Sequence, residues 1–359
     1  MNFTMRKINS FSIHIIFTLL GAGVLLLVMS SSSLSQEIKK CLICHGKPDL
    51  KKVLKSGRVI SLYVDEDELR GSVHAERRCG ECHVDIIEIP HKGRIKTVDC
   101  TQCHYRGNPV GAPQKDIYRD YRESVHGMAV SSGNPDAPIC QDCHGDHDIK
   151  GIDDPYSRVY KLNISGTCAR CHLEIYAKFK MSIHGVALDQ GIMDAPACTD
   201  CHGEHAIKGP ESPESSVFAT KIGETCPKCH AAEGIMSKYG IETSQVTTYQ
   251  ESYHGVASKF GQRLVANCAS CHGVHDIRPP EDPLSSVYIK NIPKTCGNCH
   301  PGANINFAKG KIHVEPGSRE SGLIYYVSQF FKWLTILVMI GLLIHIALDL
   351  YRKYRRRAA

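Results

Sequence analysis

Long apolar stretches lie near the two ends of the chain. The first runs from Phe11 to Met29, begins after Arg6 and Lys7, and leads into a serine-rich stretch. A basic start, a short apolar core and small residues before a cleavage point are typical of a secretory signal peptide. We therefore predict a signal peptide over residues 1–35. An uncleaved N-terminal anchor is the alternative.

The second apolar run extends from Leu323 to Leu350, which is long enough to cross a bilayer as one helix. Tyr325, Tyr326 and Trp333 lie near its start and basic residues follow its end, as expected for the interface and the cytoplasmic side of a membrane. The run predicts a transmembrane helix over residues 323–351 with a basic cytoplasmic tail, 352–359. A buried helix of a soluble protein is the alternative, which the tail disfavours. Residues 36–322 are then expected outside the cytoplasm.

The stretch between these runs is poor in large aromatic side chains, since the whole chain has one Trp and nine Phe. A soluble domain of this size normally buries more of them, so either the core is poor or something other than protein fills it. The net charge of +6 comes mostly from the C-terminal tail. Because no basic patch remains in the exported part, nucleic acid is not an expected partner.

All 18 cysteines belong to nine Cys-x-x-Cys pairs, and a histidine follows every pair directly. In chain order, the motifs are Cys41, Cys44 and His45; Cys79, Cys82 and His83; Cys100, Cys103 and His104; Cys140, Cys143 and His144; Cys168, Cys171 and His172; Cys198, Cys201 and His202; Cys226, Cys229 and His230; Cys268, Cys271 and His272; and Cys296, Cys299 and His300.

This spacing is that of covalent c-type haem attachment. Two thiols separated by two residues can add to the two vinyl groups of one haem, and the adjacent histidine supplies the proximal ligand of the iron. A redox dithiol, a disulfide or half a zinc site needs no histidine at that position. We therefore predict nine covalently bound c-type haems. Attachment after export agrees with the predicted signal peptide.

The middle of the chain repeats three times, near residues 124–172, 182–230 and 252–300. Each copy holds a Ser-x-His-Gly segment, a Cys-x-x-Cys-His-Gly-x-His segment, a Pro-x-Ser-x-Val segment and a second haem motif. Copies one and two are offset by 58 residues, and copies two and three by 70. The twelve extra residues, around Ile235 to Thr248, are expected to form a loop insertion.

Eleven histidines lie outside the motifs. His14 falls in the signal peptide and His345 in the membrane helix, which leaves nine in the exported part. An iron with histidine on both faces is saturated and transfers electrons, whereas an open position admits a substrate. Nine spare histidines for nine haems predict bis-histidine ligation throughout. The predicted distal ligands are His74, His91, His126, His147, His184, His205, His254, His275 and His313.

The spacing does not say which distal histidine serves which iron. His147 is too close to His144 to reach the opposite face of the same haem, so we expect it to serve a neighbour. Residues 36–322 provide only roughly 32 residues for each haem, which is too few for ordinary hydrophobic domains. We expect a mainly α fold with sparse regular structure, packed around haems and followed by one C-terminal transmembrane helix.

Residues 41–313 resemble multihaem c-type cytochromes with doubled motifs, related to the cytochrome c3 and tetrahaem quinol-dehydrogenase groups. The C-terminal helix is similar to that of multihaem subunits of inner-membrane cytochrome b/c complexes in metal- and sulfate-respiring bacteria. The resemblance implies a haem domain in the periplasm, held by one span to the bacterial inner membrane. It also implies a membrane b-type cytochrome or quinone-reactive subunit as one partner, and periplasmic or outer-membrane cytochromes as the other.

The expected function is electron transfer between these partners, and no catalytic residue is predicted. The alternative is a multihaem reductase of the nitrite, hydroxylamine or tetrathionate type, which would need an open iron. A filament-forming cytochrome is a third possibility, which the membrane helix disfavours. His345 would contact a quinol or a partner's b-haem, or would make a polar contact between helices.

Overall fold

The computed structural model describes residues 37–53, 59–91, 95–308, 313 and 319–358. The predicted signal peptide and His14 lie outside these residues. The chain divides into two compact units. Unit 1 contains the residues up to Cys171 together with Glu204–Ile207, and unit 2 contains His172–Gly203 and Lys208–Ala359.

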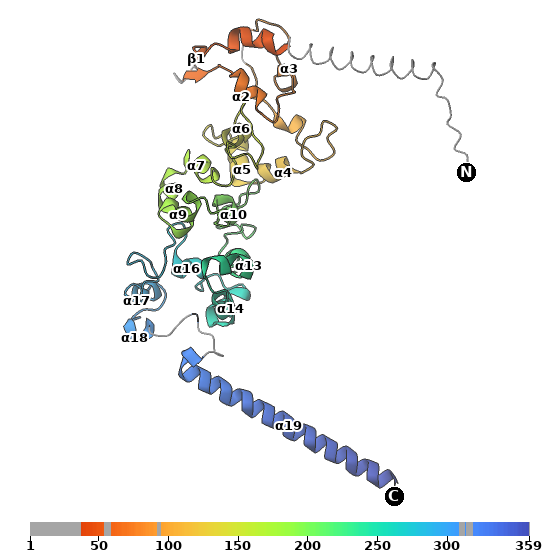
Figure 1. Cartoon of the computed structure of the whole chain (residues 1–359), viewed down its shortest axis with the longest axis vertical. Helices are drawn as coiled ribbons and strands as arrows, with labels where there is room; N and C mark the ends of the chain where they lie inside the picture. The colour runs from red at the N-terminus through yellow and green to blue at the C-terminus, as the bar shows by residue number, and fades with distance from the viewer. Residues whose placement is uncertain (1–36, 54–58, 92–94, 309–312, 314–318, 359) are drawn as a thin grey trace, which may run out of the picture. The chain divides into compact units, whose positions relative to one another are not determined.

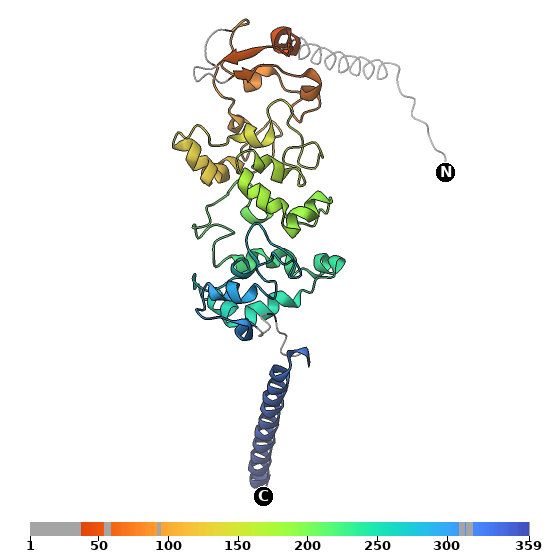
Figure 2. The ribbon, with the colours of Figure 1, turned by 90° about the vertical axis from the view of Figure 1, so that its left-hand side faces the viewer.

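Unit 1 consists of short helices joined by irregular connections, with one small hairpin (Figures 1 and 2). Residues 37–45 are helical, and strands β1 and β2 pair antiparallel. The elements are β1 (Lys51–Val53), β2 (Val59–Ser61), α2 (Glu66–Arg70), α3 (Cys79–Cys82), η1 (Cys100–Gln102), α4 (Ile117–Arg122), α5 (Val125–Ser131), α6 (Cys140–His144) and α7 (Ile164–Ala169).

Unit 2 consists of short helices joined by irregular connections, has no strand among its described residues and ends in the long helix α19. Its elements are α8 (Leu173–Lys180), α9 (Ile183–Asp189), α10 (Cys198–His202), α11 (Ile222–Thr225), α12 (Pro227–His230), α13 (Glu233–Met236), η2 (Ser237–Tyr239), α14 (Ser244–Glu251), α15 (Tyr253–Lys259), α16 (Cys268–His272), α17 (Ile292–Gly297), α18 (Ile305–Ala308), η3 (Arg319–Ser321) and α19 (Leu323–Ala358). The prediction of a mainly helical fold with sparse regular structure is therefore confirmed.

Helix α19 is long and apolar enough to cross a membrane, with a mean hydropathy of 2.2 over its most apolar stretch and no part of that stretch buried. The single C-terminal helix expected from the sequence is present. It continues without a break through the basic residues to Ala358. An ion pair joins Asp349 to Lys353, one turn on, at 2.8 Å.

The Ser-x-His-Gly segment forms the start of a helix in each copy, at α5, α9 and α15. The serine is the N-cap, and its hydroxyl accepts a hydrogen bond from the glycine N–H three residues on. In the second copy, Ser182 is completely buried and a Cβ on Gly185 would collide with the carbonyl oxygen of Phe179. The glycine is therefore required because the preceding chain packs directly against the helix.

Polar contacts, not large apolar side chains, fill much of the described interior. The largest fully buried side chains are serines, and Ser157, Ser215 and Ser285 come from the three Pro-x-Ser-x-Val segments. Each donates from its hydroxyl to a backbone carbonyl seven residues earlier, at Lys150, Lys208 and Arg278. Only seven described apolar residues are buried: Leu188, Ala195, Ala197, Phe218, Met236, Tyr249 and Ala257. So little apolar burial leaves the core poor in protein, as the composition indicated.

The insertion in the third copy is helical, so the prediction of a loop there is wrong. Helix α13 and η2 supply the extra residues, and α14 takes the place that α8 has in the second copy. Met236 is buried, and Lys238 and Tyr239 both bond the Asp194 carboxylate, at 2.8 and 2.9 Å. The insertion is therefore ordered by packing onto the second copy, which short-range sequence signals do not reveal.

Candidate functional site

The first haem motif of each copy is carried by a single helical turn, at α6, α10 and α16. A side chain inside the motif closes the turn. Asp142 accepts a hydrogen bond from the Ile139 N–H at 2.8 Å, and Asp200 accepts one from the Ala197 N–H at 2.7 Å. The glycine after the histidine has a positive φ of 92°, 82° or 85° in the three copies, which ends the turn. This short turn holds two thiols and one imidazole close together.

Eight motif histidines face a second histidine ring at a nearly constant distance. We number the sites 1 to 9 in motif order. The ring-centre distances are 6.0 Å for His45 and His91 (site 1), 6.2 Å for His83 and His147 (site 2), 6.0 Å for His104 and His74 (site 3), 6.0 Å for His144 and His205 (site 4), 6.0 Å for His202 and His275 (site 6), 6.1 Å for His230 and His184 (site 7), 6.3 Å for His272 and His313 (site 8), and 6.1 Å for His300 and His254 (site 9).

The pairs share this distance but not a ring orientation, because the angle between ring planes ranges from 2° to 74°. Direct stacking would favour a particular angle. A metal between two imidazoles fixes the distance and leaves the rotation about the axis free. Two metal–nitrogen bonds of about 2 Å, plus about 1 Å from each nitrogen to its ring centre, give about 6 Å. The spacing therefore fits one metal ion held axially.

Each pair joins one motif histidine to one of the spare histidines predicted as distal ligands. His147 faces His83 and not His144, as its short distance along the chain led us to expect. His126 lies in α5 and His172 directly precedes α8. The roles of these two as ligands stay predictions from the histidine count.

The pairing follows the repeat. The histidine of a Cys-His-Gly-x-His segment faces the first motif of the preceding copy: His205 faces His144, and His275 faces His202. In the last copy no further segment exists, and His313 takes this place against His272. The Ser-x-His-Gly histidine faces the second motif of its own copy, as His184 does with His230. Neither relation could be derived from spacing alone.

Twelve of these histidines have a lowered pKa, which favours the neutral form that binds metals. Burial lowers the pKa of His184 to about 4. Burial is also the main cause of a lowered pKa in eleven others: His74, His83, His104, His144, His147, His202, His205, His230, His272, His275 and His313.

Hydrogen bonds to Nδ1 orient two of the imidazoles, whereas a third has no such bond. The Nδ1 atom of His45 lies 2.7 Å from the carbonyl oxygen of Leu62, so Nδ1 carries the proton and Nε2 keeps its lone pair for a metal. His313 Nδ1 lies 3.2 Å from the Thr248 hydroxyl. His83 Nδ1 is the one buried side-chain nitrogen or oxygen in the described part of the chain that lacks a protein partner. The supporting groups Leu62 and Thr248 have no signal in the sequence.

Within the described residues, no group of three or more His, Cys, Asp or Glu side chains converges in a way that could hold a metal. A structural zinc site needs four protein ligands at one point. The facing imidazoles would instead suit a haem iron, with the two thiols of the adjacent motif available to attach the haem.

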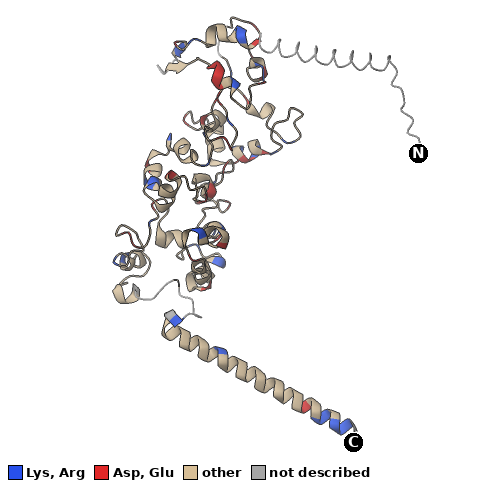
Figure 3. Cartoon of the chain, in the orientation of Figure 1, with Lys and Arg blue, Asp and Glu red and all other residues tan. Residues whose placement is uncertain are grey.

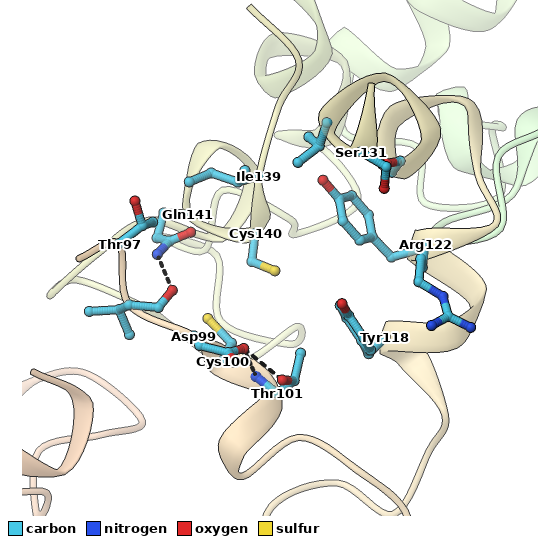
Figure 4. Close-up of a pocket in the computed structure, with 14 residues that line it drawn as sticks. Thr97, Asp99, Cys100, Thr101, Tyr118, Arg122, Ser131, Ile139, Cys140 and Gln141 are labelled. Carbon is cyan, nitrogen blue, oxygen red and sulfur yellow. Dashed lines mark hydrogen bonds between the residues drawn. The ribbon is translucent and has the colours of Figure 1, made fainter. Parts of the chain in front are cut away.

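Cysteines of consecutive motifs lie next to each other. The thiols of Cys100 and Cys140 are hydrogen-bonded and point toward one another beside a cavity of about 170 Å³ that Tyr118 also lines (Figure 4). The same thiol contact joins Cys41 to Cys79 and Cys226 to Cys268. Four further cysteine pairs are close enough to interact electrostatically: Cys82 with Cys103, Cys143 with Cys168, Cys201 with Cys229 and Cys271 with Cys296. Within each unit, consecutive motifs are therefore neighbours in space.

Comparisons with known proteins do not assign this chain to a family. The chain matches no protein-family model, no curated protein and no solved structure. The function is therefore argued from the motifs, the paired histidines and the apolar helix.

Proposed function

We propose that this protein is a membrane-tethered nonahaem c-type cytochrome that carries electrons between a membrane partner and redox proteins outside the cytoplasm. The observation that supports it best is the set of eight imidazole pairs at 6.0 to 6.3 Å. Each pair adjoins a Cys-x-x-Cys turn that can hold a haem through two thioethers. Two independent features, the motif and the axial pair, thus point to the same cofactor at the same places.

Each residue has one task in this account. The cysteines would bind the haem edge, the motif histidines would hold one face of the iron, and the spare histidines the other face. Haem supplies one-electron chemistry at the iron. A site with two protein ligands on the iron leaves no position for a substrate, which favours a carrier over a reductase.

The adjacency of consecutive motifs supports transfer from site to site. Each haem would be attached through its cysteines, so thiols in contact would bring the edges of two macrocycles together. Sites 1 to 4, whose cysteines and histidine pairs both lie in unit 1, would form one run and sites 6 to 9 in unit 2 another. Short distances between neighbouring centres are what an electron relay requires.

Helix α19 supports the membrane tether. Its basic end would lie in the cytoplasm, and the proposed haem sites would then lie in the periplasm of a bacterial cell. A b-type cytochrome or quinone-reactive subunit in the inner membrane would then exchange electrons with the haems, and periplasmic or outer-membrane cytochromes would be the other partners.

His345 is exposed on α19 and would contact a quinol or a b-haem of the membrane partner. Unchanged quinol-dependent haem reduction in His345→Ala would contradict this role.

The experiment is expression with a c-type haem maturation system, followed by intact-mass measurement of the purified protein. The proposal predicts a mass increase of nine haems that resists acid–acetone extraction, because the thioethers are covalent. A variant with both cysteines of site 6 replaced, Cys198→Ala and Cys201→Ala, should carry eight. A wild-type chain without covalent haem would contradict the proposal.

A further inference from the structure

One backbone hydrogen bond recurs beside the spare histidines. The N–H of Val73 donates to the carbonyl oxygen of Ile149, that of Val125 to Ile207, and that of Ile183 to Ile277, each at 2.8 Å. We call this contact the linking bond. In every case the donor directly precedes a Ser-x-His histidine, and the acceptor lies two residues after a Cys-His-Gly-x-His histidine.

The linking bond therefore ties together two histidines that face different motifs. In unit 2 it joins the segment of His184, which faces site 7, to the segment of His275, which faces site 6. In unit 1 it joins His74 of site 3 to His147 of site 2. The cysteines of the same sites are neighbours too, Cys201 with Cys229 and Cys82 with Cys103.

Both sides of the linking bond are held firmly. On the donor side, Ser182 is the buried N-cap of α9 and its hydroxyl accepts the Gly185 N–H at 3.0 Å. On the acceptor side, the residue after Ile277 is Arg278, whose carbonyl accepts the hydroxyl of the buried Ser285 at 3.2 Å. A displacement of one histidine would therefore be passed to the other through one hydrogen bond between two anchored segments.

We propose that the linking bond positions the sixth ligands of two neighbouring haem sites as a single unit, so that the two irons change coordination together. The proposal rests on the proposed function, because it concerns the ligands of its haems. Val73, Val125 and Ile183 are positioning residues in this account, since they act through the histidines that follow them.

Proline substitution can remove the linking bond alone. Ile183 is the first residue of α9, a position whose N–H has no partner within the helix and where proline is well tolerated. Ser182 before it is extended, with φ −79° and ψ 159°, as a residue that precedes proline prefers. Ile183→Pro therefore deletes the donor and leaves the helix start intact.

The chain offers a matched control in its third copy. Tyr253 is the first residue of α15 and follows the extended N-cap Ser252, but its N–H meets no backbone acceptor among the described residues. Tyr253→Pro makes the same chemical change where no linking bond exists. Ile183→Ala keeps the N–H and removes most of the side chain, so it separates the bond from side-chain packing.

The test is electron paramagnetic resonance with spin quantitation on the full-length haem-loaded protein. In Ile183→Pro, two of the nine low-spin signals should shift or be lost together while intact mass still shows nine haems. Tyr253→Pro and Ile183→Ala should give the wild-type spectrum. If Ile183→Pro does not fold, Val125→Pro, at the start of α5 after the extended Ser124, tests the same bond in unit 1.

A wild-type spectrum in the folded proline variants would overturn the proposal, and so would a change at one haem alone or an equal change in Tyr253→Pro. These results leave the proposed function standing, because the haems are counted by mass in every variant. Absence of haem from the wild-type protein would instead contradict the proposed function itself.

Discussion

The repeated part of the chain, residues 124–308, and the part that precedes it, residues 37–123, place their histidines by different means. In the first two copies of the repeated part, a buried serine cap, a glycine packed against the preceding carbonyl and a linking bond occur at equivalent positions. His184 and His205 are therefore positioned by the register of the copies.

In the preceding part, Val73 makes a linking bond beside His74, but His45 is placed by individual contacts. His45 is oriented by the carbonyl of Leu62 just beyond the β1–β2 hairpin, and a second bond joins the Val64 N–H to the His45 carbonyl at 2.7 Å. The helix cap there, Asp65 of α2, is only partly buried, whereas Ser182 is fully buried. The ring-centre distance is nevertheless 6.0 Å at site 1, as at site 4. The same distance between two histidine rings can therefore be produced by contacts that recur from copy to copy or by contacts that occur once in the chain.

The largest effect should follow from removing one whole copy. Deletion of residues 125–182 joins Ser124 to Ile183 and removes two motifs with two spare histidines. Because every copy presents the same contacts, His205 should then face His83 in place of His147. We expect a folded protein with seven haems, all low-spin, measured by intact mass and electron paramagnetic resonance.

A second deletion, of residues 183–252, tests the same rule with the longer offset between the second and third copies. If both deletion variants fail to fold, or if both contain high-spin iron because a haem lacks its second histidine, the copies are not interchangeable.

A single ligand in the repeated part should matter at one site only. His205→Ala removes the imidazole that faces His144, so one iron of nine should become high-spin while the site of the adjacent His202 is unaffected. Glu204→Ala, at the neighbouring position, should leave all signals unchanged. A change at His202, seen as a second altered iron, would mean that the pairing we describe is wrong.

The packed glycine should be the next most sensitive position. Gly185→Ala places a Cβ against the carbonyl oxygen of Phe179, so the backbone must shift at a cost on the order of 2 kcal/mol of unfolding free energy. Gly166→Ala in α7 is the control, because a Cβ there meets nothing within 4 Å and alanine favours the helix. Thermal unfolding should show a lower Tm for the first variant only. Equal Tm values would contradict the close packing.

Removing a helix cap should have the smallest effect on stability, but the size of the effect should still differ between the two parts of the chain. Ser182→Ala removes a buried cap from α9, which costs about 1 kcal/mol of unfolding free energy. Asp65→Ala removes a partly exposed cap from α2, where water can replace the lost bonds, so we expect a smaller decrease in Tm. A larger decrease for Asp65→Ala in the same thermal scan would reverse the contrast.

Much of this arrangement could be predicted from the sequence. Cys198, His202 and His205 could be identified as candidate site residues because the motif spacing and the repeat are local features of the sequence. The long helix α19 was equally plain from its apolar length. The haem itself, the ligand roles of the histidines, the function and the partners stay predictions.

The rest depends on contacts between segments far apart in the chain. The pairing of His275 with His202 arises because one copy packs on the next, and no spacing within a copy encodes it. The linking bond of Ile183 is made by backbone atoms, which any side chain would provide. The helices of the insertion were missed because Met236 is buried by tertiary packing and not by a regular periodic pattern.

The central claim is that each cysteine motif holds an iron between two histidines. Electron paramagnetic resonance of the purified, oxidised wild-type protein, recorded with and without cyanide, tests it most directly. The account predicts low-spin signals that integrate to nine irons and do not change when cyanide is added, because both axial positions are filled. A substantial high-spin signal that cyanide converts to low spin would reveal an open iron, contradict the account and favour a reductase.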